Sequence, residues 1–221
     1  MKANTWTRIA VIAVIAALFS LPAFAQNNTE FRVTITNLTK GQIFSPPLVV
    51  SHSRDVAVFQ SGSPALPELG ILAEDGDPAP LRGVLDTLPQ VFETAVAGGP
   101  VLPGQTVTVL INARFPYDRI SAVGMLIQTN DAFFGLNSVE IPERRMRGVY
   151  SVPAYDAGTE ANNELCAFIP GPPCGSGGVR DTADAEGYVY INNGITGIGD
   201  LEPSEFTWLN PSARITIRRT R

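Results

Sequence analysis

Apolar and polar residues alternate with a period of two along several short stretches of the chain, which is the pattern of half-buried β-strands. The clearest of these stretches are residues 31–36, 106–111, 187–191 and 213–217. Residues 120–127 form a longer apolar stretch that contains Gly124, as is typical of a central strand. Weaker candidates are residues 48–50, 56–59 and 149–152. Turns rich in Gly, Pro, Asn and Asp separate these stretches, so the pattern predicts an all-β, antiparallel β-sandwich with long loops.

Strand alternation is missing from one region, where Pro67–Glu74 and Pro80–Leu88 each favour a short helix. We expect one or two short helices there, which form a crossover within the same domain. Between them, Asp75-Gly76-Asp77-Pro78 is typical of a turn. It repeats too few ligand positions for an EF-hand calcium loop.

The N-terminus has the features of an export signal. Lys2 and Arg8 precede an uncharged apolar run from Ile9 to Leu21, and Ala23-Phe24-Ala25 provides the small residues of a cleavage site. We therefore expect residues 1–25 to be a signal peptide and residues 26–221 to form a single domain. The run is short for a bilayer span of about 20 residues, so we predict an exported protein, periplasmic or extracellular, that is not transmembrane after cleavage.

The net charge of the chain bears on which classes of partner it can bind. Cleavage after Ala25 removes Lys2 and Arg8 and no acid, which changes the formal net charge from −5 to −7. An acidic chain is a poor candidate for nonspecific nucleic-acid binding, which depends on Lys and Arg that neutralise phosphates. We expect no nucleic-acid partner.

The chain has two cysteines, Cys166 and Cys174, separated by a short segment rich in Pro and Gly. In an oxidising compartment this spacing favours a disulfide-closed loop. Free thiols or a metal-binding pair are the alternatives. A zinc site is disfavoured because zinc needs four ligands and the one histidine, His52, lies far away in sequence.

Two segments, Thr129–Gly135 and Tyr155–Glu164, place carboxylates and amides around small residues, after the apolar stretch 120–127 and in the long loop region. Calcium binds six to eight oxygen ligands from such groups. Asp131, Asp156 and Glu160 are the candidate metal ligands, and a glycine between the last two permits a tight turn.

In their order along the chain and in their residues, the two segments resemble the spondin N-terminal domain family. Asp131-Ala132-Phe133-Phe134-Gly135 is similar to that family's Asp-Trp-Phe-x-Gly motif, and Asp156-Ala157-Gly158-Thr159-Glu160 to its Asp-Ala-Gly-Thr-Asp motif. The resemblance extends to residues 45–52 and 73–77 and covers about Phe31 to Pro211. It implies a bacterial, secreted spondin-domain protein with a calcium-binding β-sandwich, in which Asp131, Asp156 and Glu160 hold the ion. Ala132 and Glu160 are the two departures from the family pattern.

The resemblance further implies a binding or adhesion module at the cell envelope or surface, with a surface glycan, a lipid head group or an envelope protein as partner. We predict no catalytic residue. His52 beside Asp55 invites a hydrolase interpretation, but no Gly-x-Ser-x-Gly elbow accompanies them, so a structural histidine is favoured. Two other functions stay open: a metal-assisted extracytoplasmic hydrolase, and a metal-free structural envelope protein.

Three further groups of residues have simple interpretations. The basic patches at residues 144–147 and 214–221 favour a solvated strand edge, and contact with an anionic glycan or lipid head group is the alternative. Phe133, Phe134 and Trp208 favour core packing over an exposed recognition patch. Asp181, Asp184 and Glu186 favour a solvated loop edge.

Overall fold

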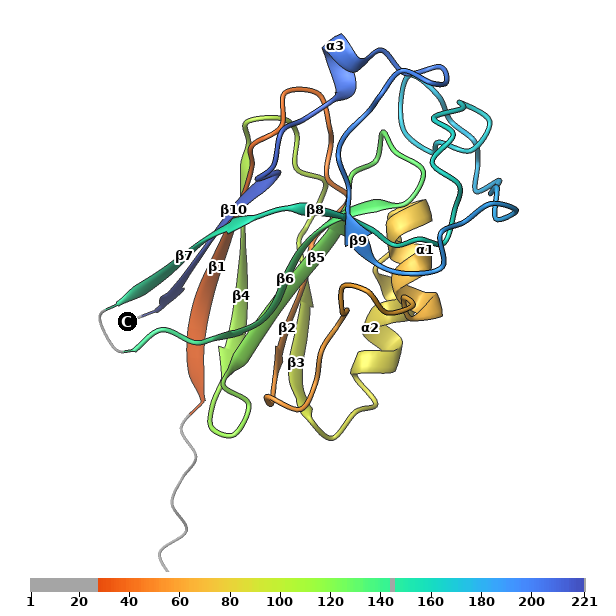
Figure 1. The fold of residues 1–221 in the computed structure, drawn as a ribbon. Helices are drawn as coiled ribbons and strands as arrows, with labels where there is room; N and C mark the ends of the chain where they lie inside the picture. Colours follow the sequence, from red (N-terminus) through yellow and green to blue (C-terminus); the bar gives the residue numbers. More distant parts are fainter. Residues whose placement is uncertain (1–27, 144–145, 221) are drawn as a thin grey trace, which may run out of the picture.

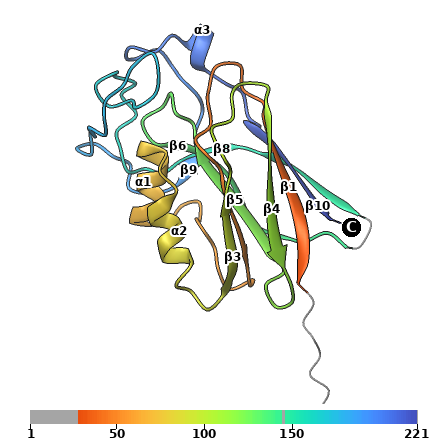
Figure 2. The same cartoon turned by 180° about the vertical axis from the view of Figure 1, so that it is seen from behind.

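The structure is a computed structural model that describes residues 28–143 and 146–220. Two antiparallel sheets face each other, and two helices cover the far side of one of them (Figures 1 and 2). The all-β sandwich predicted from the alternation is confirmed. The predicted signal peptide, residues 1–25, lies outside the described residues.

The first sheet has four strands and contains both ends of the described chain. Its strand order is β4 (Thr106–Ala113), β1 (Thr29–Asn37), β10 (Ala213–Arg219) and β7 (Arg147–Val152). All neighbouring strands pair antiparallel, with Val33 opposite both Ile217 and Val109. β1 and β10 are therefore interior strands, and β4 and β7 are the edges.

The second sheet has six strands and carries the candidate site. Its order is β3 (Val91–Val96), β2 (Leu48–His52), β5 (Arg119–Met125), β6 (Ala132–Glu140), β8 (Ala154–Asp156) and β9 (Tyr190–Ile191). Every residue of β2 is buried, because one face packs on the other sheet and the opposite face is also covered. This explains why β2 and β5 have weak alternation in the sequence.

The main core lies between the sheets. Val33, Ile35, Ile215 and Ile217 line it from the first sheet, and Ile120 and Phe134 from the second. At Gly124 a Cβ atom would lie 2.6 Å from Cε1 of Phe134. A side chain at this position would displace the Phe134 ring, so the glycine inside this strand is required for close packing.

A second core lies between the six-stranded sheet and helices α1 (Pro67–Asp75) and α2 (Ala79–Leu85). Leu69, Leu72, Leu81 and Leu85 of the helices pack there with Val50 and Phe133. The predicted turn is present, since Gly76 ends α1 in the left-handed conformation with φ of 69°. A third, one-turn helix, α3 (Pro203–Phe206), precedes β10.

The aromatic residues of the first acidic segment are core residues, as the sequence favoured. Phe133 and Phe134 are fully buried, one in each core, and Trp208 is 5% exposed. Residues 56–59 are not a strand, although Val58 and Phe59 are buried in the second core. β3, β6 and β8 have no counterpart among the predicted strands. β6 shows no alternation because its first residues belong to the acidic segment.

The predicted disulfide between Cys166 and Cys174 is present. Its loop packs on the connection between β5 and β6: Gly171 N donates to Ile127 O at 3.2 Å. A Cβ atom at Gly171 would lie 2.2 Å from Cγ2 of Ile127. None of the helices within the described residues is long and apolar enough to cross a membrane.

Candidate metal centre

Strand pairing brings the two acidic segments together. β6 pairs with β8 so that Ala132 lies opposite Asp156, and Ala157 N donates to the backbone oxygen of Asp131 at 3.1 Å. Asp131 precedes β6 and Asp156 ends β8, so both carboxylates lie at the same end of the sheet. Both side chains are fully buried.

One oxygen of the Asp131 carboxylate fastens the loop that follows β8. Oδ2 accepts hydrogen bonds from Thr159 N at 2.7 Å, from Thr159 Oγ1 at 3.2 Å and from Glu160 N at 3.1 Å. The loop can turn this sharply because Gly158 has φ of 68°, and a Cβ atom there would lie 2.4 Å from Tyr188 O. The other oxygen, Oδ1, is buried and has no hydrogen-bond partner among the described residues.

Asp156 is held by amides from three directions. Its Oδ1 accepts from Gly158 N at 2.8 Å. Its Oδ2 accepts from Asn162 Nδ2 at 2.7 Å and from Asn192 Nδ2 at 2.9 Å. The Asn162 amide nitrogen also contacts the hydroxyl of Tyr190 at 2.8 Å and Glu186 Oε1 at 3.1 Å.

Among the described residues, none of the largest effects on the charge of this pair comes from a positive side chain. Burial raises the pKa of Asp131 well above its usual range, and the charge of Asp156 raises it further. Burial also raises the pKa of Asp156 to about 6, with partial relief from the Asn162, Gly158 and Asn192 hydrogen bonds. Two buried carboxylates without a counter-charge are costly, and either a proton or a bound cation reduces that cost.

The backbone amide of Glu160 donates to Asp131, but the Glu160 carboxylate lies among other residues. Its Oε1 accepts from Asp181 N at 3.2 Å. Burial raises its pKa to about 8, the charge of Glu74 adds to the shift, and Arg180 opposes it. Arg180 itself forms an ion pair with Glu74 at 2.7 Å and a second one with Asp75.

The fit of this region to a hard cation is partial. Carboxylates and amides are the oxygen ligands that calcium takes, and the buried, unpartnered oxygens Asp131 Oδ1 and Glu160 Oε2 are available as ligands. Within residues 28–143 and 146–220, however, no group of three or more His, Cys, Asp or Glu side chains is placed to hold a metal ion. Asp131 and Asp156 form the centre of the candidate site, and Glu160 as a third ligand stays a prediction.

A pocket of about 180 Å³ opens beside the pair. Asn162 and Asn192, which hold Asp156, and Tyr190 form part of its wall. Burial and the charge of Asp156 raise the pKa of Tyr190, so its hydroxyl stays protonated and donates. Asn130 and Asn193 also line the pocket, together with Ile195 and Ile198, so its wall combines amide and hydroxyl groups with apolar surface.

A fourth buried carboxylate in this region, that of Glu164, accepts hydrogen bonds from three backbone amides and one hydroxyl. Glu164 Oε1 accepts from Thr196 N at 2.6 Å and Thr196 Oγ1 at 2.8 Å. Its Oε2 accepts from Gly197 N at 2.7 Å and Ile198 N at 3.1 Å. Glu164 therefore fixes the far wall of the pocket.

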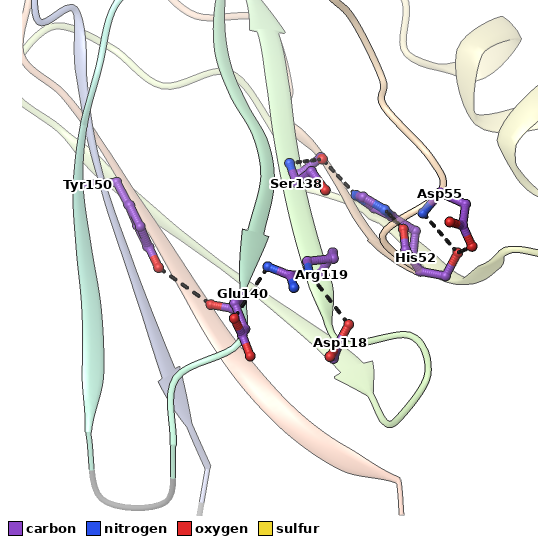
Figure 3. A network of polar contacts seen from close by, with 9 residues as sticks. His52, Asp55, Asp118, Arg119, Ser138, Glu140 and Tyr150 are labelled. Carbon is purple, nitrogen blue, oxygen red and sulfur yellow. Dashed lines mark hydrogen bonds and ion pairs between the residues drawn. The ribbon is translucent and has the colours of Figure 1, made fainter.

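The one histidine belongs to a separate, buried network (Figure 3). His52 Nδ1 lies 2.7 Å from Ser53 O, and Nε2 lies 2.8 Å from Ser121 Oγ. A carbonyl only accepts, so Nδ1 carries the proton and Nε2 accepts from the Ser121 hydroxyl. Asp55 contacts Ser53 instead of the imidazole. The structure therefore places His52 in a structural role, as the sequence favoured, with no His–Asp pair.

Some residues of the site had no usable signal in the sequence. Asn192 and Tyr190 lie more than 30 residues from Asp156 along the chain, and only the pairing of β8 with β9 brings them together. Glu186 is exposed, in agreement with the predicted solvated loop edge, and it also contacts Asn162 and accepts from the Tyr190 hydroxyl at 3.1 Å. These contacts could not be read from the sequence because they depend on how the loop folds back toward the pair.

Comparison of the sequence with models of protein families and with curated proteins gave no match. The fold and the geometry of the site are therefore the basis for any statement about function.

Proposed function

We propose that the protein is an exported binding module whose loops at one end of the sandwich are fixed by a calcium ion. The observation that carries this proposal is the buried pair Asp131 and Asp156. Among the described residues, no positive side chain is a main influence on its charge, and one of its oxygens has no hydrogen-bond partner. Asp131, Asp156 and Glu160 would hold the ion, as the resemblance to spondin domains implies. The ion would supply a positive charge to the buried pair Asp131 and Asp156.

The positive charge of the ion would affect the loops that Asp131 and Asp156 hold. Asp131 binds the backbone at Thr159 and Glu160, and Asp156 binds Asn162 and Asn192, so the two carboxylates anchor the segments that line the pocket. Neutralising the pair would strengthen the hold on those segments. The pocket would then present a fixed set of amides and hydroxyls to a surface partner, whether a glycan, a lipid head group or an envelope protein.

We propose a function in binding, without catalysis. Both carboxylates are fully buried and each is held by amide donors, which suits ligands to an ion better than groups that exchange protons with a substrate. The disulfide Cys166–Cys174 is compatible with an oxidising, extracytoplasmic location. It also supports the same loop end, because its loop packs on the β5–β6 connection.

The test is calcium titration of chelator-treated protein, followed by calorimetry and by thermal unfolding. A ligand that binds only the native state raises Tm, so we expect calcium to raise Tm by several degrees and magnesium to raise it less. Asp131→Asn and Asp156→Asn should each abolish the calcium shift. Asp184→Asn, which removes a charge from the exposed part of the same loop region, is the matched control and should retain the shift.

Identical unfolding curves in calcium and in chelator would contradict the calcium site and would favour the metal-free structural alternative. A calcium shift that survives both Asp131→Asn and Asp156→Asn would place the ion elsewhere and would also contradict the proposal.

A further inference from the structure

The outer face of the four-stranded sheet has an unusual composition. The side chains that alternate onto it from β1, β4, β7 and β10 include four arginines and a single acid, Glu30. We call it the arginine face; it is defined by Arg32, Arg147, Arg214 and Arg218 together with Thr34, Thr36, Thr106, Thr108 and Thr216. The protein as a whole is acidic, with a formal net charge of −5. Positive charge is therefore gathered on one face.

Strand register places these residues in rows across the sheet. One row contains Arg32, Arg218 and Arg147 on three successive strands. The next row is Thr108, Thr34, Thr216 and Val149, and the third is Thr106, Thr36, Arg214 and Ser151. Neighbouring strands lie about 4.8 Å apart, so the three arginines of the first row span roughly 10 Å.

These arginines form no ion pair within the described part of the chain, unlike three arginines elsewhere in the protein. Arg82, Arg119 and Arg180 each form ion pairs with Asp or Glu. The four arginines of the arginine face form no ion pair with any residue in the ranges 28–143 and 146–220. Like charges directly opposite one another on a sheet are destabilising, so an external anion would relieve their repulsion.

Protection of a strand edge does not account for this pattern. Charged residues on an edge strand prevent pairing with another sheet, which was the interpretation favoured from the sequence. The structure corrects it: β1 and β10 are interior strands, so Arg32, Arg214 and Arg218 do not lie on an edge. Of the four arginines, Arg147 alone is on an edge strand, β7.

The arginine face is also hollowed. A depression of about 470 Å³ crosses all four strands and is lined by Thr34, Thr36, Thr106, Arg147, Val149, Arg214 and Thr216. A second one, of about 390 Å³, is lined by Arg32, Arg218, Arg219 and Thr220. Thr36 and Thr106 are linked through their hydroxyls at 3.0 Å, so the floor of the first depression carries an ordered array of hydroxyl groups.

We propose that the arginine face binds an anionic polysaccharide. Guanidinium groups pair with carboxylate or sulfate through two parallel hydrogen bonds. The threonine hydroxyls between the arginine rows are suited to the neutral hydroxyls of the sugar rings, which both donate and accept. The depression across the sheet would hold a linear chain, with its anionic groups at the arginines.

Two other polyanions fit this surface less well. A single-stranded nucleic acid is bound by basic grooves with aromatic side chains on which the bases stack, and no aromatic residue alternates onto this face from β1, β4, β7 or β10. A peripheral membrane surface needs a buried apolar or aromatic side as well as positive charge. Leu110 and Val149 are the large apolar side chains of this face, and they lie on separate strands.

The arginine face does not depend on the calcium site. The candidate site lies on the six-stranded sheet, beyond the main core, and shares no residue with the arginine face. Binding to the arginine face should therefore be the same in calcium and in chelator. It should also be unaffected by Asp131→Asn, so failure of the calcium proposal and failure of this one are distinguishable.

The test is a titration of the protein with five probes in low salt, with the dissociation constant of each measured in chelator. Heparin supplies sulfate groups, polygalacturonate supplies carboxylates, and dextran is the neutral control. Vesicles of phosphatidylglycerol and a single-stranded oligothymidine are the two anionic probes that are not saccharides. We expect binding to at least one of the two anionic polysaccharides, at least tenfold weaker in 0.3 M salt, and none to dextran. Which of the two binds more tightly identifies the anionic group.

The decisive variant is the double substitution Arg32→Gln with Arg218→Gln, which should weaken binding at least tenfold. Arg54→Gln removes one charge from an exposed turn outside this face and should change binding less than twofold. Thr34→Val with Thr216→Val keeps every charge and should weaken polysaccharide binding at least threefold. The proposal is overturned by no binding to either anionic polysaccharide, by equal losses in the face variant and in Arg54→Gln, or by tighter binding to vesicles or oligothymidine.

Discussion

The Asp131 carboxylate accepts hydrogen bonds from both the backbone amide and the hydroxyl of Thr159, at 2.7 and 3.2 Å. This contact joins the connection before β6 to the loop after β8, which are 28 residues apart in the chain. One oxygen of the same carboxylate is thus structural, while the other remains without a partner. The structural role and the metal-binding role of Asp131 can be separated by mutation.

Asp131→Ala should destabilise the chelator-treated protein by about 1–3 kcal/mol, because the buried amides of Thr159 and Glu160 lose their acceptor. Asp131→Asn keeps an acceptor oxygen and removes a buried negative charge beside Asp156, so it should cost much less. Urea unfolding in chelator measures both. Equal losses for the two variants would show that the charge, rather than the acceptor, maintains this contact.

Stability in chelator should fall as pH rises from 6.5 to 8. Glu160 has a pKa raised to about 8 from its ordinary value of 4.5, so the folded state keeps a proton that the unfolded state releases. Where the folded state binds more protons, stability decreases with rising pH, at most by about 1.4 kcal/mol per pH unit for each such group. The raised pKa of Asp131 acts in the same direction.

Urea unfolding at three pH values in this window measures the slope, and Glu160→Gln should reduce it. The control is Glu205→Gln, which removes an exposed carboxylate from α3. A stability that rises with pH over this window, or a slope unchanged by Glu160→Gln, would contradict the placement of Glu160 in a buried, acidic setting.

The pKa of His52 should lie below 6.5. Burial disfavours the charged imidazole and is the largest cause of the lowered pKa. The hydrogen bond to the Ser53 carbonyl opposes this effect, and the positive charge of Arg119 adds to it. His52 is the one histidine of the chain, so its ring proton signal in an NMR titration is unambiguous. Because the unfolded state then binds the proton more readily, this group lowers stability as pH falls below 6.5. A midpoint at or above 6.5 would be inconsistent with the buried network of Figure 3.

Ser121→Ala tests the same network by another route. The Ser121 hydroxyl satisfies His52 Nε2 and accepts from Ser138 N at 2.9 Å. Removing it leaves two buried polar groups unpaired, at a cost of about 1–3 kcal/mol. Chemical unfolding measures the loss, and Ser151→Ala, at an exposed strand position, is the control.

Reduction of the disulfide should act on the candidate site as well as on stability. A cross-link between residues eight apart contributes about 2–3 kcal/mol by the chain-entropy relation. Because the closed loop packs on Ile127, next to the segment that carries Asp131, the variant Cys166→Ser with Cys174→Ser should also weaken calcium binding. Calorimetry of this variant measures both effects, and unchanged calcium affinity would show that the loop is independent of the site.

Much of the fold could be predicted from the sequence because it depends on local pattern. Period-two alternation identified β1, β4 and β10, and the lack of alternation after Pro67 identified α1 and α2. The same reasoning missed β6, whose first residues combine an acidic segment with aromatic residues buried on both faces. A strand covered on two sides loses its alternation, so the pattern no longer distinguishes it from a loop.

The candidate site was predictable only in part. Residue type and the resemblance to spondin domains made Asp131, Asp156 and Glu160 the predicted ligands, and the pairing of β6 with β8 brings the first two together. The sequence could not show that the Glu160 carboxylate lies with Glu74 and Arg180, because that contact joins α1 to a loop more than 80 residues away. Nor could it identify Asn192, which reaches Asp156 only through the β8–β9 pairing.

The sequence by itself determined the strand and helix periodicity, the disulfide spacing and the carboxylates of the two acidic segments, because each depends on residues close together in the chain. The tertiary structure alone decided which strands are interior, and hence that Arg32 and Arg218 lie side by side on an open face instead of along an edge. It also decided that Asp131 and Asp156 are buried together, with no described positive side chain as a main influence on the charge of the pair. Burial and strand order arise from contacts between distant segments, which residue spacing does not encode.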